Sequence, residues 1–556
     1  MVPCPHTGVR ASTCLGVALI LLLAAAVRFA GITDRELWLD ESCTYYYVHH
    51  LFNWPADGPD PWLELTTVPY TVLLHAWTRV AGETILGLRS FSAVAGLLTV
   101  VALMYVAARV AGRRAGAIAG ALAALHPLQV YYSQEARVYA LWCLECTLLL
   151  WSLYQAARLQ SPRWWVAYAL LVVMTTATHY YTLFWLPASA VAVLLSPRAL
   201  HFAKQWTVTH AVLGVVLLPF IMFIIVPLTG RGSQMWLEDV WASYPPALAL
   251  LRSCWALLPA GGYPEAYLGP LAAATGVLGE AVGTWLTRLV QWGPAALILL
   301  LLLVWGIRKP VARMTAQSAQ VSPASGRHVA FFALLTLATL ATPFLYSWLV
   351  RPAYVVGRYD LCALPALLLT VTLLLDGALR NAGSRIAATA FLLLCSAATT
   401  VGLHAVPVQI ETPERVRRLQ EHVGPHDLVV SVGMYRWFLA YELNRQGFST
   451  RIISFPPAHD RQVGWDNPRA ELADPEGIKP AVTSTLTGIR RVLHDGARVW
   501  LLWQGDPTGP RWEVDSQLLA GLREAGYDVR GHDPWLGLLE VTVPATPREG
   551  RSEPRP

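Results

Sequence analysis

Two short polar segments hold the residues of this chain that are best suited to chemistry. The first, Trp38-Leu-Asp-Glu-Ser42, is acidic at Asp40 and Glu41, and the second contains Glu135 and Arg137. Both segments lie beside apolar stretches that are long enough to cross a bilayer. Ionised side chains are costly in such a place unless something uses them. We therefore predict that the two segments face the same side of a membrane and form one active site, in which a carboxylate serves as a general base.

Aromatic and hydrogen-bonding side chains surround both acidic segments. Beside Asp40 stand Trp38 and three consecutive tyrosines, and an aromatic-lined carboxylate pocket is how proteins hold sugars and tune a general base. Around Glu135 the polar side chains are His126, Tyr131, Tyr132, Ser133, Gln134 and Tyr139. Two plainer alternatives stay open from the residues alone. The first acidic pair is also typical of a solvated loop, and Glu135 with Arg137 is also typical of an ion pair at the interface.

Further candidates lie at the same predicted edge of the membrane. His179 precedes Tyr180 and a second tyrosine, Arg358 precedes Tyr359, and Arg89 begins an apolar stretch. A cation at this edge is suited to hold an anionic group, although Arg89 is also suited simply to anchor lipid phosphates. A histidine at an interface is more often packed than functional.

Glu145 is predicted to lie inside an apolar stretch. Ionisable residues within a membrane are candidates for function by default. A hydrogen bond to a neighbouring helix explains such a residue equally well, so its role stays open.

The composition indicates a membrane protein. Of the 556 residues, 55% are hydrophobic and only 14% are charged, with a mean hydropathy of +0.42. A soluble multi-domain protein of this length is less apolar, so we predict a polytopic α-helical membrane protein. The net charge of +6 does not indicate a nucleic-acid partner, because the excess of Lys and Arg lies in the membrane half, where it orients helices.

Apolar stretches predict about eleven crossings of the bilayer at roughly 20 residues each. We place them near 12–30, 86–108, 115–132, 138–157, 164–179, 181–196, 206–227, 290–307, 330–350, 361–379 and 386–404. The first is interpreted as an uncleaved span, because no small-residue cleavage site follows it. The two short stretches that meet at His179 are alternatively one broken helix.

The distribution of cations predicts the orientation. Counted from a cytoplasmic amino terminus, the inside loops contain neither Asp nor Glu. Their cations are Arg10, Arg109, Arg113, Arg114, Arg158, Arg163, Arg198, Lys204, Arg308, Lys309, Arg313, Arg327, Arg380 and Arg385. This segregation predicts a cytoplasmic amino terminus and an extracytoplasmic carboxyl-terminal part, in the cytoplasmic (inner) membrane. Residues 69–77, in the first outside segment, have the aromatic pattern of an interfacial helix.

The chain after the last span has the pattern of a soluble domain. Helical stretches near 413–423, 434–446, 479–494 and 515–525 alternate with apolar runs that begin at residues 428, 451, 499 and 538. This alternation predicts a small α/β domain with a largely parallel sheet. It contains no Gly-rich phosphate loop. We therefore divide the chain into a membrane domain at 1–404, an extracytoplasmic α/β domain at 405–545 and a disordered tail at 546–556.

Six motifs together resemble the GT-C superfamily of bacterial membrane glycosyltransferases, and most of all glycosyltransferase family 39. That family includes the protein O-mannosyltransferases and the aminoarabinose transferase of lipid A. The resemblance extends over residues 12–404. Its motifs are Leu39-Asp-Glu-Ser, Pro69-Tyr-Thr-Val-Leu-Leu-His-Ala-Trp, Leu88-Arg-Ser-Phe-Ser, His126-Pro-Leu-Gln-Val-Tyr-Tyr-Ser-Gln-Glu-Ala-Arg-Val-Tyr, Thr178-His-Tyr-Tyr and Arg358-Tyr-Asp-Leu. The combination of the Tyr-Ser-Gln-Glu-Ala-Arg block with an upstream Asp-Glu is specific to this family, whereas the other motifs are weak alone. The chain departs from the family in having Val68-Pro69 where two prolines are frequent.

The resemblance implies an inverting transfer of a sugar from a polyprenyl-phosphate donor to an acceptor hydroxyl of a protein, lipid or glycan. The catalytic residues would be Asp40, Glu41 and Glu135. The donor phosphate would be bound by Arg89, Arg137, Arg358 and Tyr359. A divalent cation, Mg²⁺ or Mn²⁺, would be held by Asp40, Glu135 and His179. The cavity for the substrate would be lined by Trp38, Tyr132, Gln134, Tyr139 and Tyr180.

A competing hypothesis is a transporter or flippase of lipid-linked glycan intermediates. Such proteins are typically built from internal repeats with charged residues near the middle of the membrane. The predicted polar residues instead gather at one face, and the two halves of the chain show no repeat.

Overall fold

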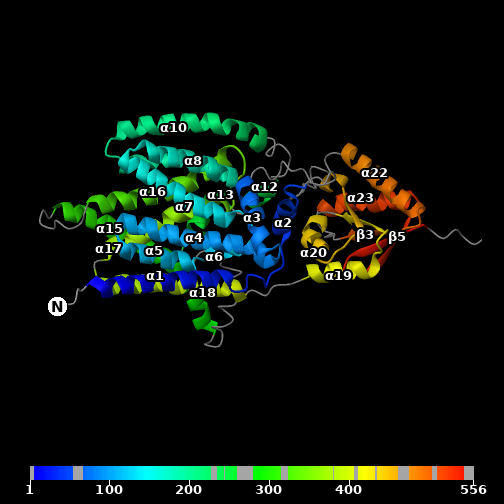
Figure 1. The fold of residues 1–556 in the computed structure, drawn as a ribbon, viewed down its shortest axis with the longest axis horizontal. Coiled ribbons are helices and arrows are strands. Elements are labelled where there is room, and N and C mark those ends of the chain that lie inside the picture. The colour runs from blue at the N-terminus through cyan, green and yellow to red at the C-terminus, as the bar shows by residue number, and fades with distance from the viewer. Residues whose placement is uncertain are drawn as a thin grey trace, which may run out of the picture. The chain divides into compact units, whose positions relative to one another are not determined.

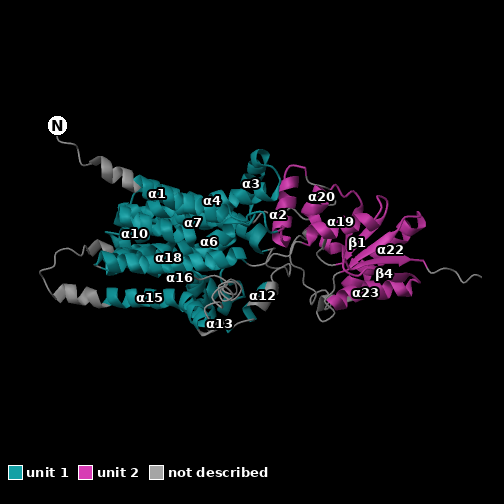
Figure 2. Cartoon of the chain, turned by 90° about the horizontal axis from the view of Figure 1, so that it is seen from below, with its two compact units in different colours: residues 1–35, 65–226, 236–408 teal, residues 36–64, 227–235, 409–556 magenta. Residues whose placement is uncertain are grey.

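The computed structural model describes residues 6–53, 67–226, 235–242, 245–258, 280–314, 323–379, 381–405, 411–432, 435–460, 475–503 and 510–543. The predicted tail at 546–556 lies outside these residues. The chain forms two compact units. The first comprises residues 1–35, 65–226 and 236–408, and the second comprises residues 36–64, 227–235 and 409–556 (Figure 2).

The first unit is entirely helical in its described residues. Its helices are α1 (His6–Phe29), α3 (Val68–Ala81), α4 (Ile85–Ala111), α5 (Arg113–Leu125), α6 (Pro127–Ser133), α7 (Tyr139–Leu159), α8 (Pro162–Thr178), η2 (Tyr180–Phe184), α9 (Trp185–Ala188), η3 (Ser189–Leu195), α10 (Ala199–Phe220), η4 (Ile221–Ile225), most of α12 (Met235–Ala242), α13 (Pro246–Ala256), α15 (Glu280–Met314), α16 (Pro323–Leu349), η6 (Tyr359–Ala363), α17 (Leu364–Ala378) and α18 (Ala382–Ala405) (Figure 1). The predicted interfacial helix is α3.

Seven helices among the described residues are long and apolar enough to cross a membrane. They span Ile85–Ala111, Tyr139–Leu159, Ala199–Ile225, Val282–Gly306, Gly326–Leu349, Tyr359–Ala378 and Ala382–Ala405. Shorter apolar helices cover Cys14–Phe29 and Tyr180–Leu195. The prediction of a polytopic helical membrane protein is confirmed, while the number of about eleven crossings stays a prediction.

Loops that were predicted to lie inside meet at one end of the first unit. Asp376 near the end of α17 is 3.4 Å from Arg385 and 3.9 Å from Arg114, measured from Oδ1 to each Nη1. Gln160 Nε2 after α7 donates to the carbonyl of Arg198 at 3.1 Å. Arg158 Nη1 donates to the hydroxyl of Tyr154, which is also 3.2 Å from His328 Nε2 near the start of α16. The orientation of these loops relative to the membrane stays a prediction.

Helix α5 ends at Leu125, because Pro127 has no amide hydrogen and restricts the backbone of His126 before it. The carbonyl of Ala123 thereby loses its usual helical donor. The guanidinium of Arg28 replaces that donor: Nη2 donates to Ala123 O at 3.1 Å, and Nη1 donates to Ala124 O at 2.9 Å. Arg28 is completely buried. A cation from α1 therefore satisfies the freed carbonyls at the entrance to the second acidic segment.

The second unit contains a five-stranded sheet in the order β2-β1-β3-β5-β4. The strands are β1 (Leu428–Val432), β2 (Arg451–Phe455), β3 (Val499–Trp503), β4 (Asp528–Asp533) and β5 (Leu538–Thr542). Strands β2, β1 and β3 are parallel, whereas β5 is antiparallel to both of its neighbours. The predicted α/β domain is confirmed, but the sheet is mixed rather than largely parallel, because β4, which the sequence did not indicate, forms a hairpin with β5.

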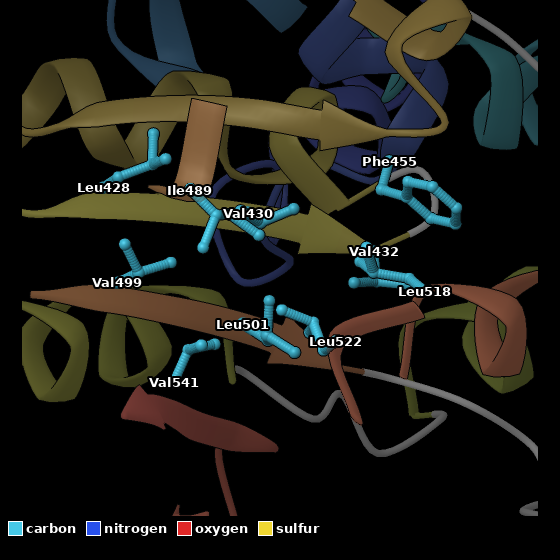
Figure 3. Packing of buried hydrophobic residues seen from close by; sticks show 10 residues of the cluster. All are labelled: Leu428, Val430, Val432, Phe455, Ile489, Val499, Leu501, Leu518, Leu522 and Val541. Atoms are coloured by element: carbon cyan, nitrogen blue, oxygen red, sulfur yellow. The ribbon is translucent and has the colours of Figure 1, made fainter. Parts of the chain in front are cut away.

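Helices cover both faces of this sheet. One face packs against α19 (Thr412–His422) and α20 (Tyr435–Arg445), and the other packs against α22 (Pro475–His494) and α23 (Pro510–Glu524). Figure 3 shows the second core, in which alternate residues of β1 and β3 meet apolar side chains of α22 and α23. The alternation follows from the period of two in a strand, which points successive side chains to opposite faces.

One further helix, α2 (Leu39–His50), belongs to the second unit although it comes near the start of the chain. It lies against α20 in both ribbon views (Figures 1 and 2). The acidic pair Asp40-Glu41 is therefore part of the unit that contains the sheet.

Candidate active site

Three segments that are far apart in the sequence meet in the first unit. They are the start of α7, the break between α8 and η2, and the turn before η6. The ring centroids of Tyr139 and His179 are 5.8 Å apart, and Arg358 Nε donates to the Tyr139 hydroxyl at 2.5 Å. The structure thus brings together three of the predicted site residues. We call Tyr139, His179 and Arg358 the polar centre.

Aromatic rings fix the position of His179. It stacks on Trp142 at 4.2 Å and on Tyr180 at 5.4 Å, and it meets the edge of Tyr359 at 5.2 Å, all measured between ring centroids. Its Nδ1 accepts a hydrogen bond from the amide of Tyr181 at 3.3 Å. In the neutral ring the proton is therefore on Nε2, which makes that atom a hydrogen-bond donor.

The guanidinium of Arg358 lies close to two tyrosine rings. Its Cζ is 5.3 Å from the ring centroid of Tyr139 and 5.8 Å from that of Tyr359. Both distances are within the range of cation–π attraction, which holds a cation without consuming its N–H donors. The arrangement therefore suits a guanidinium that must bind an anion.

The backbone turn that carries Arg358 is held on both sides. The Tyr132 hydroxyl donates to the carbonyl of Gly357 at 2.7 Å, and the amide of Gly357 donates to Asp360 Oδ2 at 3.0 Å. Gly357 has a φ of +75°, a left-handed conformation that favours glycine. Sequence reasoning missed this role of Asp360, although its position two residues after Arg358 in the motif is a usable signal.

The second acidic segment lies between α6 and α7. Glu135 is buried, and Arg137 is half-buried. Hydrogen bonds tie this segment to the interfacial helix: Ser92 Oγ donates to the carbonyl of Arg137 at 3.3 Å and lies 3.3 Å from the hydroxyl of Tyr70 in α3. Helices α3 and α4 therefore hold the backbone beside Glu135.

Two predicted site residues have contacts with the backbone. Gln134 Nε2 donates to three carbonyls at the end of α1, the shortest contact being 2.7 Å to Ala30 O. Arg89 Nη1 donates to the carbonyls of Ile32 and Arg35 at 2.9 and 2.8 Å. Both side chains therefore stabilise the exit of α1.

Glu145 lies one turn after Trp142 in α7, and its Oε1 accepts a hydrogen bond from the Thr178 hydroxyl at 3.0 Å. Of the two interpretations from the sequence, this contact supports the bond to a neighbouring helix. It links α7 to α8 immediately before His179, while the indole of Trp142 donates to Thr182 at 2.9 Å just after it. These bonds fix both sides of the break between α8 and η2.

The first acidic segment forms the start of α2 in the second unit. Asp40 and Glu41 are buried, with 9% and 0% of each residue exposed. Glu41 Oε2 accepts a hydrogen bond from the amide of Trp38 at 3.4 Å, as in a capping box. Carboxylates in the first turn are also favoured by the helix dipole. The predicted meeting of Asp40 with Glu135 concerns two different units and stays a prediction.

The described residues contain no group of three or more His, Cys, Asp or Glu side chains that could hold a metal ion. Carboxylates such as Asp40 and Glu135 are suitable ligands for Mg²⁺ or Mn²⁺. His179 does not fit this role through Nε2, because a metal-bound Nε2 requires a proton on Nδ1 and an acceptor facing it. Here the Tyr181 amide faces Nδ1 as a donor.

Comparison with known protein families finds a match over part of the chain. Residues 68–225 match the family described as dolichyl-phosphate-mannose-protein mannosyltransferase. The matched segment includes α3, the second acidic segment and His179. The match confirms the predicted resemblance to protein O-mannosyltransferase-type membrane glycosyltransferases in this segment. No curated protein matches the chain.

Solved structures of membrane enzymes have weak similarity to the whole chain. ArnT from Cupriavidus metallidurans bound to undecaprenyl phosphate is 13% identical, with a TM-score of 0.44, over 96% of this chain and 99% of that chain. The oligosaccharyltransferase from Archaeoglobus fulgidus in the apo form is 11% identical, with a TM-score of 0.46, over 93% of this chain and 73% of that chain.

Proposed function

We propose that this protein is an integral-membrane glycosyltransferase that moves a sugar from a polyprenyl-phosphate donor to an acceptor hydroxyl. The observation that carries the proposal is the polar centre, which lies at the ends of apolar helices. Two of its three residues, Tyr139 and His179, lie in the segment that matches the mannosyltransferase family. A cation and a histidine donor held by aromatic rings are suited to a phosphate that is attached to a lipid.

The reaction is a single displacement. The acceptor oxygen attacks the anomeric carbon, the bond from that carbon to the phosphate oxygen breaks, and the configuration inverts. A carboxylate, which we assign to Asp40, with Glu41 and Glu135 as the other candidates, takes the proton of the hydroxyl. Arg358, Arg137 and the Nε2–H of His179 stabilise the negative charge that develops on the departing lipid phosphate.

A divalent cation at this site would be bound by carboxylate ligands. Asp40 and Glu135 would hold Mg²⁺ or Mn²⁺, which when bound supplies further positive charge for the leaving phosphate. His179 is assigned to the phosphate rather than to the metal, because the Tyr181 amide occupies its Nδ1.

The proposed location follows from the charge pattern. Transfer would take place on the extracytoplasmic side of the cytoplasmic membrane, with the amino terminus in the cytoplasm. The acceptor would be a protein, a lipid or a glycan that reaches this side.

Replacement of the proposed base provides the direct test. Asp40→Asn keeps the size of the side chain but removes its ability to accept a proton, so the rate of sugar transfer should fall by about 100-fold or more. The measurement is the transfer of radiolabelled sugar from a polyprenyl-phosphate donor by the purified protein in liposomes. Wild-type turnover by a folded Asp40→Asn protein would exclude Asp40 as the base.

The same assay separates an enzyme from a flippase. A flippase moves the labelled lipid between leaflets without breaking the bond between sugar and phosphate, whereas the proposed enzyme releases lipid phosphate. The flippase hypothesis is not favoured, because the polar centre is built by segments at one edge of the helices rather than by repeated halves.

A further inference from the structure

The acidic helix α2 folds with the carboxyl-terminal domain rather than with the helices that precede and follow it. Residues 36–64 form one compact unit with residues 409–556. Within this unit, Glu36 Oε2 accepts a hydrogen bond from the amide of Thr412 at 2.8 Å, at the free amino-terminal end of α19. The segment that leads into α2 is thereby attached to the first helix of the carboxyl-terminal domain.

Helix α20 presents one matched face to α2. Trp437, Tyr441 and Asn444 follow one another at the spacing of i, i+4 and i+7, which places them on one side of a helix. Tyr46 meets the edge of Trp437 at 4.8 Å, and Tyr45 meets the edge of Tyr441 at 5.1 Å, measured between ring centroids. Asn444 Nδ2 also donates to the Tyr45 hydroxyl. Edge-to-face aromatic pairs have a defined geometry, so this contact fixes the rotation of α2.

Rotation of α2 determines where its carboxylates point. Glu41 lies four residues before Tyr45 and therefore on the same side of the helix, one turn nearer the amino terminus. Asp40 is its neighbour, and the carbonyl of Asp40 accepts a hydrogen bond from the Thr44 hydroxyl at 2.9 Å within the same turn. Because a helix is rigid over one turn, the position of the tyrosine pair helps to set the position of the acidic pair.

We propose that the carboxyl-terminal α/β domain is a positioning module for the acidic pair, and that Tyr441 is its principal positioning residue. Tyr441 and Trp437 hold α2 in the rotation at which Asp40 can accept a proton. This role rests on the proposed function, in which Asp40 is the base. The domain would then contribute to the chemical step of each turnover, by holding the base in place, rather than to recognition of the acceptor.

Tyr441→Ala tests the proposal in the full-length protein, with Tyr441→Phe as the conservative variant and Arg445→Ala as the matched control. Arg445 lies on the same helix, is half exposed and pairs with Glu442 in α20 itself. We expect Tyr441→Ala to lower kcat about tenfold with the KM for the donor unchanged. Tyr441→Phe and Arg445→Ala should keep wild-type kcat, since neither removes an aromatic ring from the contact.

Combination with Asp40→Asn distinguishes positioning from general damage to the fold. If Tyr441 acts through Asp40, Tyr441→Ala lowers kcat in the wild-type background but causes no further loss in the Asp40→Asn background. An equal loss in both backgrounds, or an unchanged kcat for Tyr441→Ala, would overturn the proposal.

Hydrogen–deuterium exchange gives a readout that does not depend on catalysis. Amides of residues 39–50 should exchange faster in Tyr441→Ala and at the wild-type rate in Arg445→Ala. Unchanged exchange in Tyr441→Ala would refute the positioning role even if Asp40 is the base. Faster exchange together with full activity of Asp40→Asn would instead place the failure in the proposed function, and the domain would then hold a helix without a catalytic base.

Discussion

In the second unit, the carboxylate of Asp427 accepts hydrogen bonds from the amide of Gly424 at 2.8 Å, the indole of Trp500 at 3.0 Å and the amide of Arg498 at 3.1 Å. In the first unit, the guanidinium of Arg358 is held by the Tyr139 hydroxyl and by two ring faces. Asp427 uses its acceptors to join the starts of β1 and β3. The contacts of Arg358 include two aromatic ring faces, which attract a cation through its charge, as suits a group that binds an anion.

This contrast predicts that substitutions in the two units will separate activity from stability. The largest effect on activity should come from Arg358→Gln, which removes the charge but keeps a long polar side chain. We expect kcat/KM for the polyprenyl-phosphate donor to fall by about 100- to 1000-fold, as for removal of one group that stabilises developing charge. The thermal unfolding midpoint of the membrane protein should stay within a few degrees of wild type. The matched control is Arg351→Gln, which removes a cation that pairs with Glu238 outside the polar centre. Similar activity losses in both variants would contradict the comparison.

The corresponding change in the second unit is Asp427→Asn. The new amide would place an N–H group against donors that now meet a carboxylate, so the domain should lose about 2 kcal/mol of its free energy of unfolding. The loss can be measured by denaturant unfolding followed through tryptophan fluorescence. Asp528→Asn changes a half-exposed residue that pairs with the exposed Arg530, so it should change the free energy of unfolding little. Equal losses at Asp427 and Asp528 would show that the buried network is unimportant.

Asp427 also predicts a dependence of stability on pH. Burial alone would raise the pKa of this carboxyl group, but the hydrogen bonds from Trp500, Gly424 and Arg498 and the charge of Arg498 outweigh it, so its pKa lies below the ordinary value. A depressed pKa in the folded state stabilises the fold above the unfolded-state pKa of about 3.9, and this stabilisation is lost as the pH falls through the folded-state pKa. The free energy of unfolding of the second unit should therefore decrease as the pH is lowered from about 5 to below 3.9, and Asp427→Asn should reduce this slope.

The smallest effect should come from Tyr139→Phe. This variant keeps the ring that packs on Arg358 and His179 but removes the hydroxyl that accepts from Arg358 Nε. One hydrogen bond to a charged group contributes roughly 1 to 2 kcal/mol, so transfer should slow about tenfold. Steady-state kinetics at several donor concentrations measures the loss. A decrease as large as that of Arg358→Gln would mean that the hydroxyl has a role beyond orienting the cation.

Much of the fold could be predicted because hydrophobic periodicity is a local signal. Predicted stretches at 86–108 and 138–157 correspond to α4 and α7, and the helices of the carboxyl-terminal domain lie within a few residues of their predicted positions. Strand β4 was missed because Asp528–Asp533 is polar, lies at the edge of the sheet and faces solvent over several residues. Edge strands need no continuous apolar face.

The site was less predictable, since its parts depend on long-range packing. The motifs identified Tyr139, His179 and Arg358, which the structure brings together. Nothing in the sequence shows that Gln134 binds the carbonyls at the end of α1, because a glutamine in a polar motif has the same composition whether it binds a ligand or a backbone. The sequence also does not show that α2 packs in the same unit as the sheet. Its aromatic contacts with α20 join residues that are far apart in the chain, and such contacts produce no local pattern.

The contact between Tyr45 and Asn444 joins residues that are 399 positions apart in the chain. During synthesis α2 emerges early, whereas α20 emerges only after the seven membrane-crossing helices among the described residues have been made. The contacts between α2 and α20 can therefore form only after α20 has been translated and has folded. Premature termination would leave a chain whose helices can still insert but whose carboxylates are not held, so synthesis itself would delay the onset of chemistry until the polypeptide is complete.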